Sequence, residues 1–236
     1  MQTLGTLYLF PVSLGDCDLE DILPKRNLDL VKTLTHFIAE NAKEARAFLK
    51  QCAYPEISRV QLSLVNQHVK SDELTAFLAP LLQGHNMGLM SDAGCPGIAD
   101  PGAEIIQIAH KKGIKVVPLV GPSSIVLSIM ASGFNGQNFA FNGYLPIDKN
   151  ERTKRIKELE QLAAKYKQAQ FFIETPYRNG NMYEDLLKTL QPNALLLVAT
   201  HITLQDESIL VKPVSAWKKM NAPEFYKKPT VFGIYL

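Results

Sequence analysis

Two short segments rich in glycine, proline and serine contain the residue types from which a ligand site is built. The first is SDAGCPGIADPG at residues 91–102, and the second is VGPSS at residues 120–124. Glycine lets a backbone approach a ligand closely, and proline stiffens a loop so that binding loses less conformational entropy. One such segment is equally well explained as a structural turn, but two in succession favour a binding site.

Each segment follows a short apolar run of the length expected for a buried strand. Met87–Met90 precedes the first segment and Ile114–Val120 precedes the second. Asp100 and Pro101 are typical of a helix start and Gly113 of a helix end, which predicts a helix between them. In open α/β sheets, ligands bind beyond the carboxyl ends of the strands, so we expect both segments at one edge of one sheet.

The remaining pattern alternates between strand-like and helix-like runs. Strands are predicted at 4–12, 139–144, 171–174, 194–200 and 230–236, and helices at 125–133, 152–166 and 182–190. Residues 31–49 form a helix, or a strand followed by a helix. Such alternation predicts the α/β class with largely parallel sheets. The turn at Val120–Pro122 divides the chain into an N-terminal α/β domain, residues 1–120, and a C-terminal α/β domain, residues 121–236.

Composition and charge narrow the function classes without choosing one. Of the 236 residues, 46% are hydrophobic and 20% charged, as in folded proteins, and the net charge of +2 neither favours nor excludes nucleic acid. The three cysteines form no CxxC pair and the histidines have no metal-ligand spacing, which predicts no disulfide and no metal and fits a cytoplasmic location. The N-terminus lacks a signal-peptide pattern, and no run of about 18 apolar residues predicts a membrane span.

Neither segment matches GxxxxGK(S/T) or GxGxxG, so a mononucleotide phosphate loop and a Rossmann fingerprint are not supported. Residues 87–146, from MGLMSDAGCPGIADPG through LVGPSS and ASGF to FAFNGYLP, instead resemble the tetrapyrrole methylase-type (class III) S-adenosylmethionine methyltransferases. Within them, the resemblance is greatest to the branch that methylates a cytidine ribose 2′-oxygen of bacterial 16S ribosomal RNA. IETPYR at 173–178 resembles that branch's YESPHR.

The resemblance implies two α/β domains with S-adenosylmethionine bound in a cleft between them, usually in a homodimer. It places one side of the cofactor pocket at Asp92, Ala93, Gly94, Pro96, Ile98 and Ala99, and the other at Gly121, Pro122, Ser123, Ser124 and Ile125. The C-terminal domain is expected to complete the pocket at Pro176, Thr200 and Thr230. In methyl transfer the protein mainly has to hold the acceptor oxygen in attack geometry.

The sequence departs from the family pattern in four other places, one of which is Lys228–Val231 at the final KGEF. Phe10–Gly15 replaces the family loop TPIGNL, with Ser13 at a glycine position. Glu40–Lys43 aligns with EDTR and keeps only the glutamate at its first position. Ala199–Leu204 aligns with ARELTK but lacks its arginine, glutamate and lysine. These changes leave the cofactor segments intact and alter the side expected to bind the acceptor.

Several other residues have a functional and a structural interpretation. Glu174 and Arg178 form an acceptor-side pair or a structural ion pair, and His201 is a base for a ribose hydroxyl or a structural histidine. Cys95 is a reactive thiol or a small filler. Trp217 stacks on bases, covers the C-terminal sheet or forms a dimer contact. An RNA-backbone patch or a solvated helix face is formed by four basic residues: Lys149, Arg152, Lys154 and Arg155.

The main hypothesis is therefore a cytoplasmic, metal-independent methyltransferase that uses S-adenosylmethionine. Its expected acceptor is a ribose 2′-oxygen in 16S ribosomal RNA, and its expected partner is that RNA or the small ribosomal subunit, with no membrane. One alternative is a methyltransferase for a tetrapyrrole or another small molecule. A second alternative, motivated by the lost charges, is a degenerate module that binds the cofactor or RNA without turnover.

Overall fold

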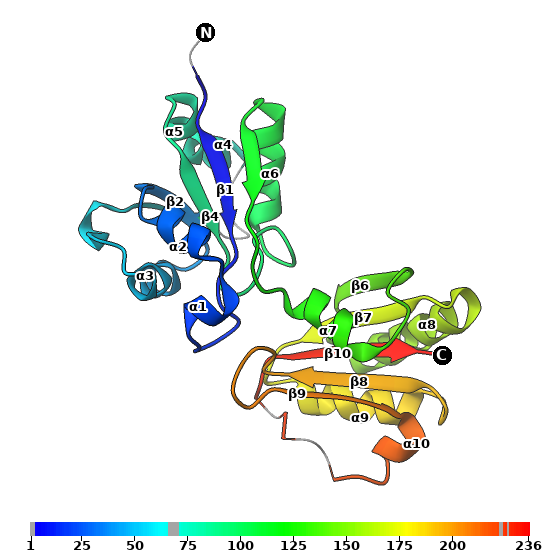
Figure 1. Cartoon of the computed structure of the whole chain (residues 1–236). Coiled ribbons are helices and arrows are strands. Elements are labelled where there is room, and N and C mark those ends of the chain that lie inside the picture. The colour runs from blue at the N-terminus through cyan, green and yellow to red at the C-terminus, as the bar shows by residue number, and fades with distance from the viewer. Residues whose placement is uncertain (1–2, 66–70, 222–223, 226) are drawn as a thin grey trace. The chain divides into compact units, whose positions relative to one another are not determined.

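The computed structural model describes residues 3–65, 71–221, 224–225 and 227–236. The chain forms two compact units, Met1–Ser123 and Ser124–Leu236, each with its own sheet (Figure 1). The predicted domain boundary, after residue 120, falls close to this division. Within the described part of the chain, no helix is long and apolar enough to cross a membrane.

The first unit contains a five-stranded sheet in the order β3-β2-β4-β1-β5. The strands are β1 (Thr6–Phe10), β2 (His36–Ala39), β3 (Gln61–Leu64), β4 (Met87–Met90) and β5 (Lys115–Pro118). Every pairing is parallel. The carboxyl ends of β1, β4 and β5 therefore meet at one edge, which places the two glycine-rich segments there as predicted.

Helices cover both faces of this sheet because its strands are apolar on both sides. Phe10 and Phe37 pack on one face with α1 (Leu19–Ile22), α2 (Lys25–Val31) and α3 (Ala42–Gln51). Leu7 and Ile38, an odd number of positions from Phe10 and Phe37 on the same strands, pack on the other face with α4 (Ser71–Phe77), α5 (Ala79–Leu82) and α6 (Gly102–Lys111). A short 3₁₀ turn, η1, spans Ile57–Arg59. Residues 31–49 thus contain strand β2 followed by most of α3, as in the second of the two alternatives.

The second unit contains a five-stranded sheet in the order β6-β7-β10-β8-β9. The strands are β6 (Phe139–Tyr144), β7 (Ala169–Glu174), β8 (Leu195–Thr200), β9 (Ser208–Pro213) and β10 (Thr230–Tyr235). Only β6 and β7 pair in parallel, so the prediction of largely parallel sheets is wrong here. The connection from β8 to β9, residues 201–207, is too short for a crossover helix and reverses the chain direction instead. Strand β9 was not predicted from the sequence.

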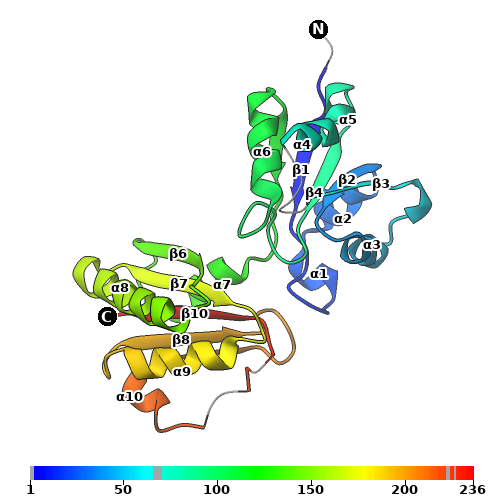
Figure 2. The ribbon, with the colours of Figure 1, turned by 180° about the vertical axis from the view of Figure 1, so that it is seen from behind.

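The second sheet is covered on one face by α8 (Lys149–Tyr166), α9 (Asn179–Thr189) and α10 (Val214–Trp217), and α7 (Ser124–Ser132) lies on the opposite face (Figures 1 and 2). Trp217 is fully buried in the larger core, where its indole N–H donates to the Leu196 carbonyl at 2.9 Å. This confirms that Trp217 covers the sheet, and the base-stacking interpretation is wrong.

Candidate functional site

Three loops meet at the carboxyl edge of the first sheet. The Val12 amide, after β1, donates to the Gly94 carbonyl, after β4, at 2.9 Å. The Cys95 thiol then donates to the Pro122 carbonyl, after β5, at 3.4 Å. The two segments singled out in the sequence are therefore in direct contact. Burial first, and then the Asp100 charge, raise the pKa of the Cys95 thiol, which together with its hydrogen bond supports the filler interpretation.

The loop over residues 91–102 holds an unusual backbone. Gly94 and Gly97 have positive φ angles of 74° and 82°, and Ala99 has 61°, which is strained for a residue with a Cβ. Asp100 braces this shape, since its Oδ1 accepts from the amides of Gly97 at 2.8 Å and Gly102 at 2.7 Å. The helix begins at Gly102, one position later than predicted. The two hydrogen bonds to Asp100 thus hold the loop in one specific conformation.

Asp100 also has an oxygen whose hydrogen-bonding capacity is unused. Its Oδ2 is buried and has no hydrogen-bond partner in the described part of the chain. Burial raises the pKa of Asp100, against the opposing effect of the two amides. The pKa values of Asp92 and Glu40 are also raised, chiefly by burial; the charge of Glu44 adds to the effect at Asp92, and the charges of Asp100 and Asp92 add to it at Glu40. A ligand with N–H or O–H donors would stabilise the ionised form of these carboxyl groups by hydrogen bonding to them.

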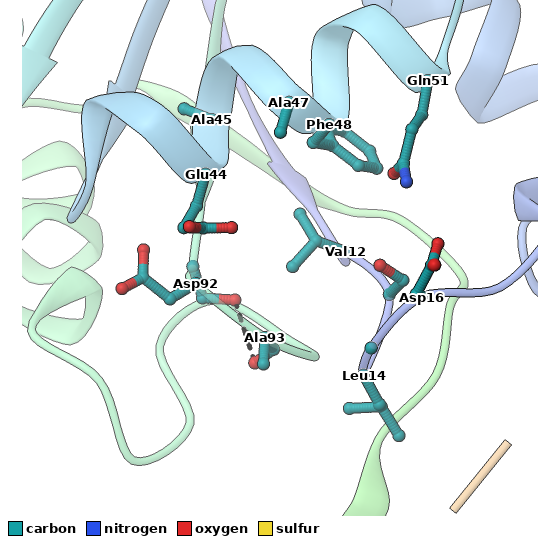
Figure 3. Close-up of a pocket in the computed structure, with 13 residues that line it drawn as sticks. Val12, Leu14, Asp16, Glu44, Ala45, Ala47, Phe48, Gln51, Asp92 and Ala93 are labelled. Carbon is teal, nitrogen blue, oxygen red and sulfur yellow. Dashed lines mark hydrogen bonds between the residues drawn. The ribbon is translucent and has the colours of Figure 1, made fainter. Parts of the chain in front are cut away.

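A pocket of about 290 Å³ opens beside this loop (Figure 3). It lies between residues 12–16, helix α3 and residues 91–93. Figure 3 shows Glu44 and Asp92 on one side of Val12, and Gln51 and Asp16 on the other. Most of the residues 10–15 that depart from the family pattern therefore line the pocket. Glu44 and Gln51 were missed in the sequence because only their helical spacing brings them to it.

The other predicted residues in this region divide between the two units. Gly121 packs tightly, because a Cβ there would come within 2.4 Å of the Pro11 Cβ. Pro122 is buried, Pro96 is buried, and Ile98 is 48% exposed. Ser123 ends the first unit, whereas Ser124 and Ile125 begin α7 in the second.

A second group of predicted residues meets at one end of the second sheet. Glu174, Thr230 and Thr200 are register partners across β7, β10 and β8. Glu174 Oε1 accepts from Arg178 Nη2 at 2.6 Å and Nε at 2.9 Å, so the structural ion pair is formed. The Asn179 side chain donates to Thr230 Oγ1 at 3.0 Å. Pro176 accepts from the Lys227 amide at 3.2 Å.

This group also contains buried oxygens whose hydrogen-bonding capacity is unused. Glu174 is 4% exposed and Asn179 is fully buried, yet Glu174 Oε2 and Asn179 Oδ1 have no partner among the described residues. Buried acceptors without partners are costly and require an explanation. No pattern in the sequence pointed to Asn179, which lies just after the IETPYR motif.

The four basic residues predicted to form an RNA-backbone patch do not lie together on one exposed surface. Arg152 is 7% exposed; its Nη2 is 2.5 Å from Asp185 Oδ2, and its Nη1 donates to the Ile147 carbonyl at 2.7 Å. This corrects the prediction that Arg152 contacts RNA, because its donors are used inside the fold. Lys149 and Lys154 are exposed, and Arg155 is half-buried.

His201 lies directly after β8, where its Nδ1 is 2.7 Å from Asp206 Oδ1. Asp206 was missed because it lies beyond residues 199–204, the part of this loop that aligns with a family motif. Among the described residues, no group of three or more His, Cys, Asp or Glu side chains could hold a metal ion.

Comparison with known proteins identifies the family. No family model matches the chain. The ribosomal RNA small subunit methyltransferase I of Vibrio cholerae is 30% identical over 209 residues, which are 89% of this chain and 69% of that protein. The protein of the same name from Xylella fastidiosa is 30% identical over 89% of this chain and 73% of its own length.

The chain belongs to the ribosomal RNA small subunit methyltransferase I family. The Escherichia coli O157:H7 member is 28% identical over 91% of this chain and 72% of its own length. A crystal structure of the methyltransferase CobJ is similar over 98% of this chain, with a TM-score of 0.64 and 18% identity, which shows the fold. The chain is therefore a methyltransferase with the two-domain α/β fold of the tetrapyrrole methylases.

Methyltransferases of this family use S-adenosylmethionine, and the residues present fit it. This cofactor carries an ammonium group, an adenine amine and ribose hydroxyls, all of which are hydrogen-bond donors. Asp100 Oδ2 in the first unit and Glu174 Oε2 and Asn179 Oδ1 in the second are buried acceptors without partners among the described residues. The donor set of the cofactor thus matches unused acceptors that each unit contains separately.

Proposed function

We propose that this protein transfers a methyl group from S-adenosylmethionine to a ribose 2′-oxygen of small-subunit ribosomal RNA. The observation that carries the proposal is the 30% identity to the Vibrio cholerae ribosomal RNA small subunit methyltransferase I over 89% of this chain. The contact between the two glycine-rich loops supports it, because both loops match the family's cofactor segments. Ribosomal subunits are cytoplasmic, and we place the reaction there.

In this proposal, the residues of the protein bind the cofactor and orient the acceptor. We assign the cofactor to the loops at 91–102 and 120–125 and to the ends of β7, β8 and β10. The cofactor supplies a methyl group that is already activated by its sulfonium. The protein must therefore hold the acceptor hydroxyl in line with that methyl group, exclude water and remove the hydroxyl proton.

We also propose that RNA phosphates contact the exposed lysines of α8. Replacing Lys149 and Lys154 together with glutamate is expected to raise the KM for small ribosomal subunits about tenfold at low salt. The effect should shrink as salt is added, because salt screens exposed charges. Steady-state methylation at several salt concentrations measures both. The matched control replaces the exposed Lys218 and Lys219 with glutamate, and an equal effect there would contradict the assignment.

A homodimer, as the family resemblance implies, is part of the proposal. Large apolar side chains are exposed on α7 and on the edge strand β6 of the second unit, namely Val126, Met130, Phe139 and Tyr144. Exposed apolar side chains of this kind are typical of protein interfaces. Light scattering of the purified protein would give its mass in solution.

The deciding experiment incubates the protein with radiolabelled S-adenosylmethionine and one of three acceptors: small ribosomal subunits, naked 16S ribosomal RNA or a tetrapyrrole precursor. We expect label in the RNA of the first, and nuclease digestion should release a 2′-O-methylated nucleoside. Label only in the tetrapyrrole would favour the small-molecule alternative. Cofactor binding without transfer would favour a module without turnover, the alternative that the changes at residues 199–204 motivate.

A further inference from the structure

The loop after β8 contains a three-residue network that the cofactor assignment does not use. His201 Nδ1 is 2.7 Å from Asp206 Oδ1, and Lys228 Nζ donates to Asp206 Oδ2 at 2.7 Å. Each oxygen of the Asp206 carboxylate therefore has one partner. The carboxylate is fixed from two directions, and it in turn fixes the orientation of the imidazole ring.

The backbone of the same loop is strained. His201 and Thr203 have φ angles of 49° and 72°, in the left-handed region that residues with a Cβ rarely adopt. The loop keeps this shape through the His201 amide, which donates to the Pro229 carbonyl at 3.2 Å, and the Thr203 amide, which donates to Glu207 at 2.7 Å. Strain maintained in this way occurs preferentially at functional sites.

The charges of the network suit a proton acceptor. Hydrogen bonds from Lys228 and then from His201 lower the pKa of Asp206 to about 2, so its carboxylate is ionised at neutral pH. An ionised carboxylate at Nδ1 holds the proton on that nitrogen and leaves Nε2 as the acceptor. The His201 side chain is 22% exposed, and within the described part of the chain only its Nδ1 has a side-chain partner.

The network also lies beside residues assigned to the cofactor. Thr200, the residue before His201, pairs in register with Thr230, which pairs with Glu174. Asp206 contacts the imidazole directly, and Lys228 is joined to it through Asp206. Glu207 lies on the same loop, and the Glu174–Arg178 ion pair lies two strands away at the end of β7.

We propose that His201 is the base that accepts the proton of the acceptor hydroxyl, with Asp206 as its positioning residue. The inference rests on the proposed function. The proton moves from the hydroxyl oxygen to Nε2. The electron pair left on the oxygen forms the new bond to the methyl carbon, whose bond to sulfur breaks with its pair remaining on sulfur. Nε2 then passes the proton to water.

The test uses His201→Asn, because asparagine tolerates left-handed φ and retains a donor for Asp206 while removing Nε2. We expect kcat on small ribosomal subunits to fall about a hundredfold, within the usual range for a general base. The acid limb of the pH profile of kcat should disappear, and added imidazole should restore part of the rate. The affinity for S-adenosylmethionine, measured by calorimetry, should stay within about twofold, since positioning of the loop is retained. His110→Asn, at an exposed position in α6, is the matched control.

A second variant, Asp206→Asn, tests the positioning role without removing the base. Loss of the carboxylate should release the imidazole from its fixed orientation, so kcat should fall while the KM for small subunits and the affinity for S-adenosylmethionine stay near the wild-type values. An active wild-type protein whose His201→Asn variant keeps the wild-type rate or pH profile would overturn this inference alone. An Asp206→Asn variant that keeps the wild-type kcat would overturn the role of Asp206. A wild-type protein that methylates no small subunit would overturn the proposed function as well.

Discussion

Replacing Arg152 with alanine is expected to lower the free energy of unfolding by about 3–5 kcal/mol, because the change leaves Asp185 buried without its ion pair. Both side chains are less than one-tenth exposed, and the guanidinium donates to Asp185 through Nε and Nη2. It also donates to the Ile147 carbonyl, so alanine leaves several buried acceptors without a partner. Urea unfolding followed by circular dichroism measures the loss.

Two comparisons make the Arg152 result specific. Lys154→Ala, on the exposed face of the same helix, should change stability by less than about 0.5 kcal/mol. The double variant Arg152→Met with Asp185→Leu should recover much of the stability, because it removes the unpaired charge and refills the volume. If Arg152→Ala is as stable as the wild type but binds small subunits weakly, Arg152 contacts RNA and the buried structural role given to it here is wrong.

Replacing Gly121 with alanine is expected to weaken S-adenosylmethionine binding about a hundredfold, equivalent to about 2.7 kcal/mol. The new Cβ would lie 2.4 Å from the Pro11 Cβ and 2.8 Å from its Cγ, so the loop must move. Pro122, the next residue, accepts the Cys95 hydrogen bond that joins the two cofactor loops. Displacing one loop therefore disturbs both, and misplacement by about 1 Å is enough for a large loss.

Calorimetric titration with S-adenosylmethionine measures this effect in the absence of any acceptor. Gly136→Ala is the matched control, because no atom lies within 4 Å of a Cβ built there. Its affinity should equal that of the wild type. Unchanged affinity in Gly121→Ala, with a folded protein, would show that the loop at 120–124 does not bind the cofactor.

The sequence by itself determined the local elements around the cofactor loops. The predicted strands at 87–90 and 139–144 coincide with β4 and β6. The segments 91–102 and 120–124 could be predicted as a joint site because apolar runs, glycines and prolines act locally, and because parallel strands bring their carboxyl ends to one edge. The similarity to the methyltransferase family was also visible in these residues.

Only the tertiary structure decided which charged and polar side chains are available. Arg152 and Lys154 belong to the same basic run, yet Arg152 is buried against Asp185 and Lys154 is exposed. The difference arises because helix α8 packs one face against the hydrophobic core of the second unit. His201 meets Asp206 and Lys228 only because the chain reverses between β8 and β9 and the segment before β10 returns beside it. Local pattern sets the elements, whereas burial and long-range pairing depend on contacts between residues distant in the chain.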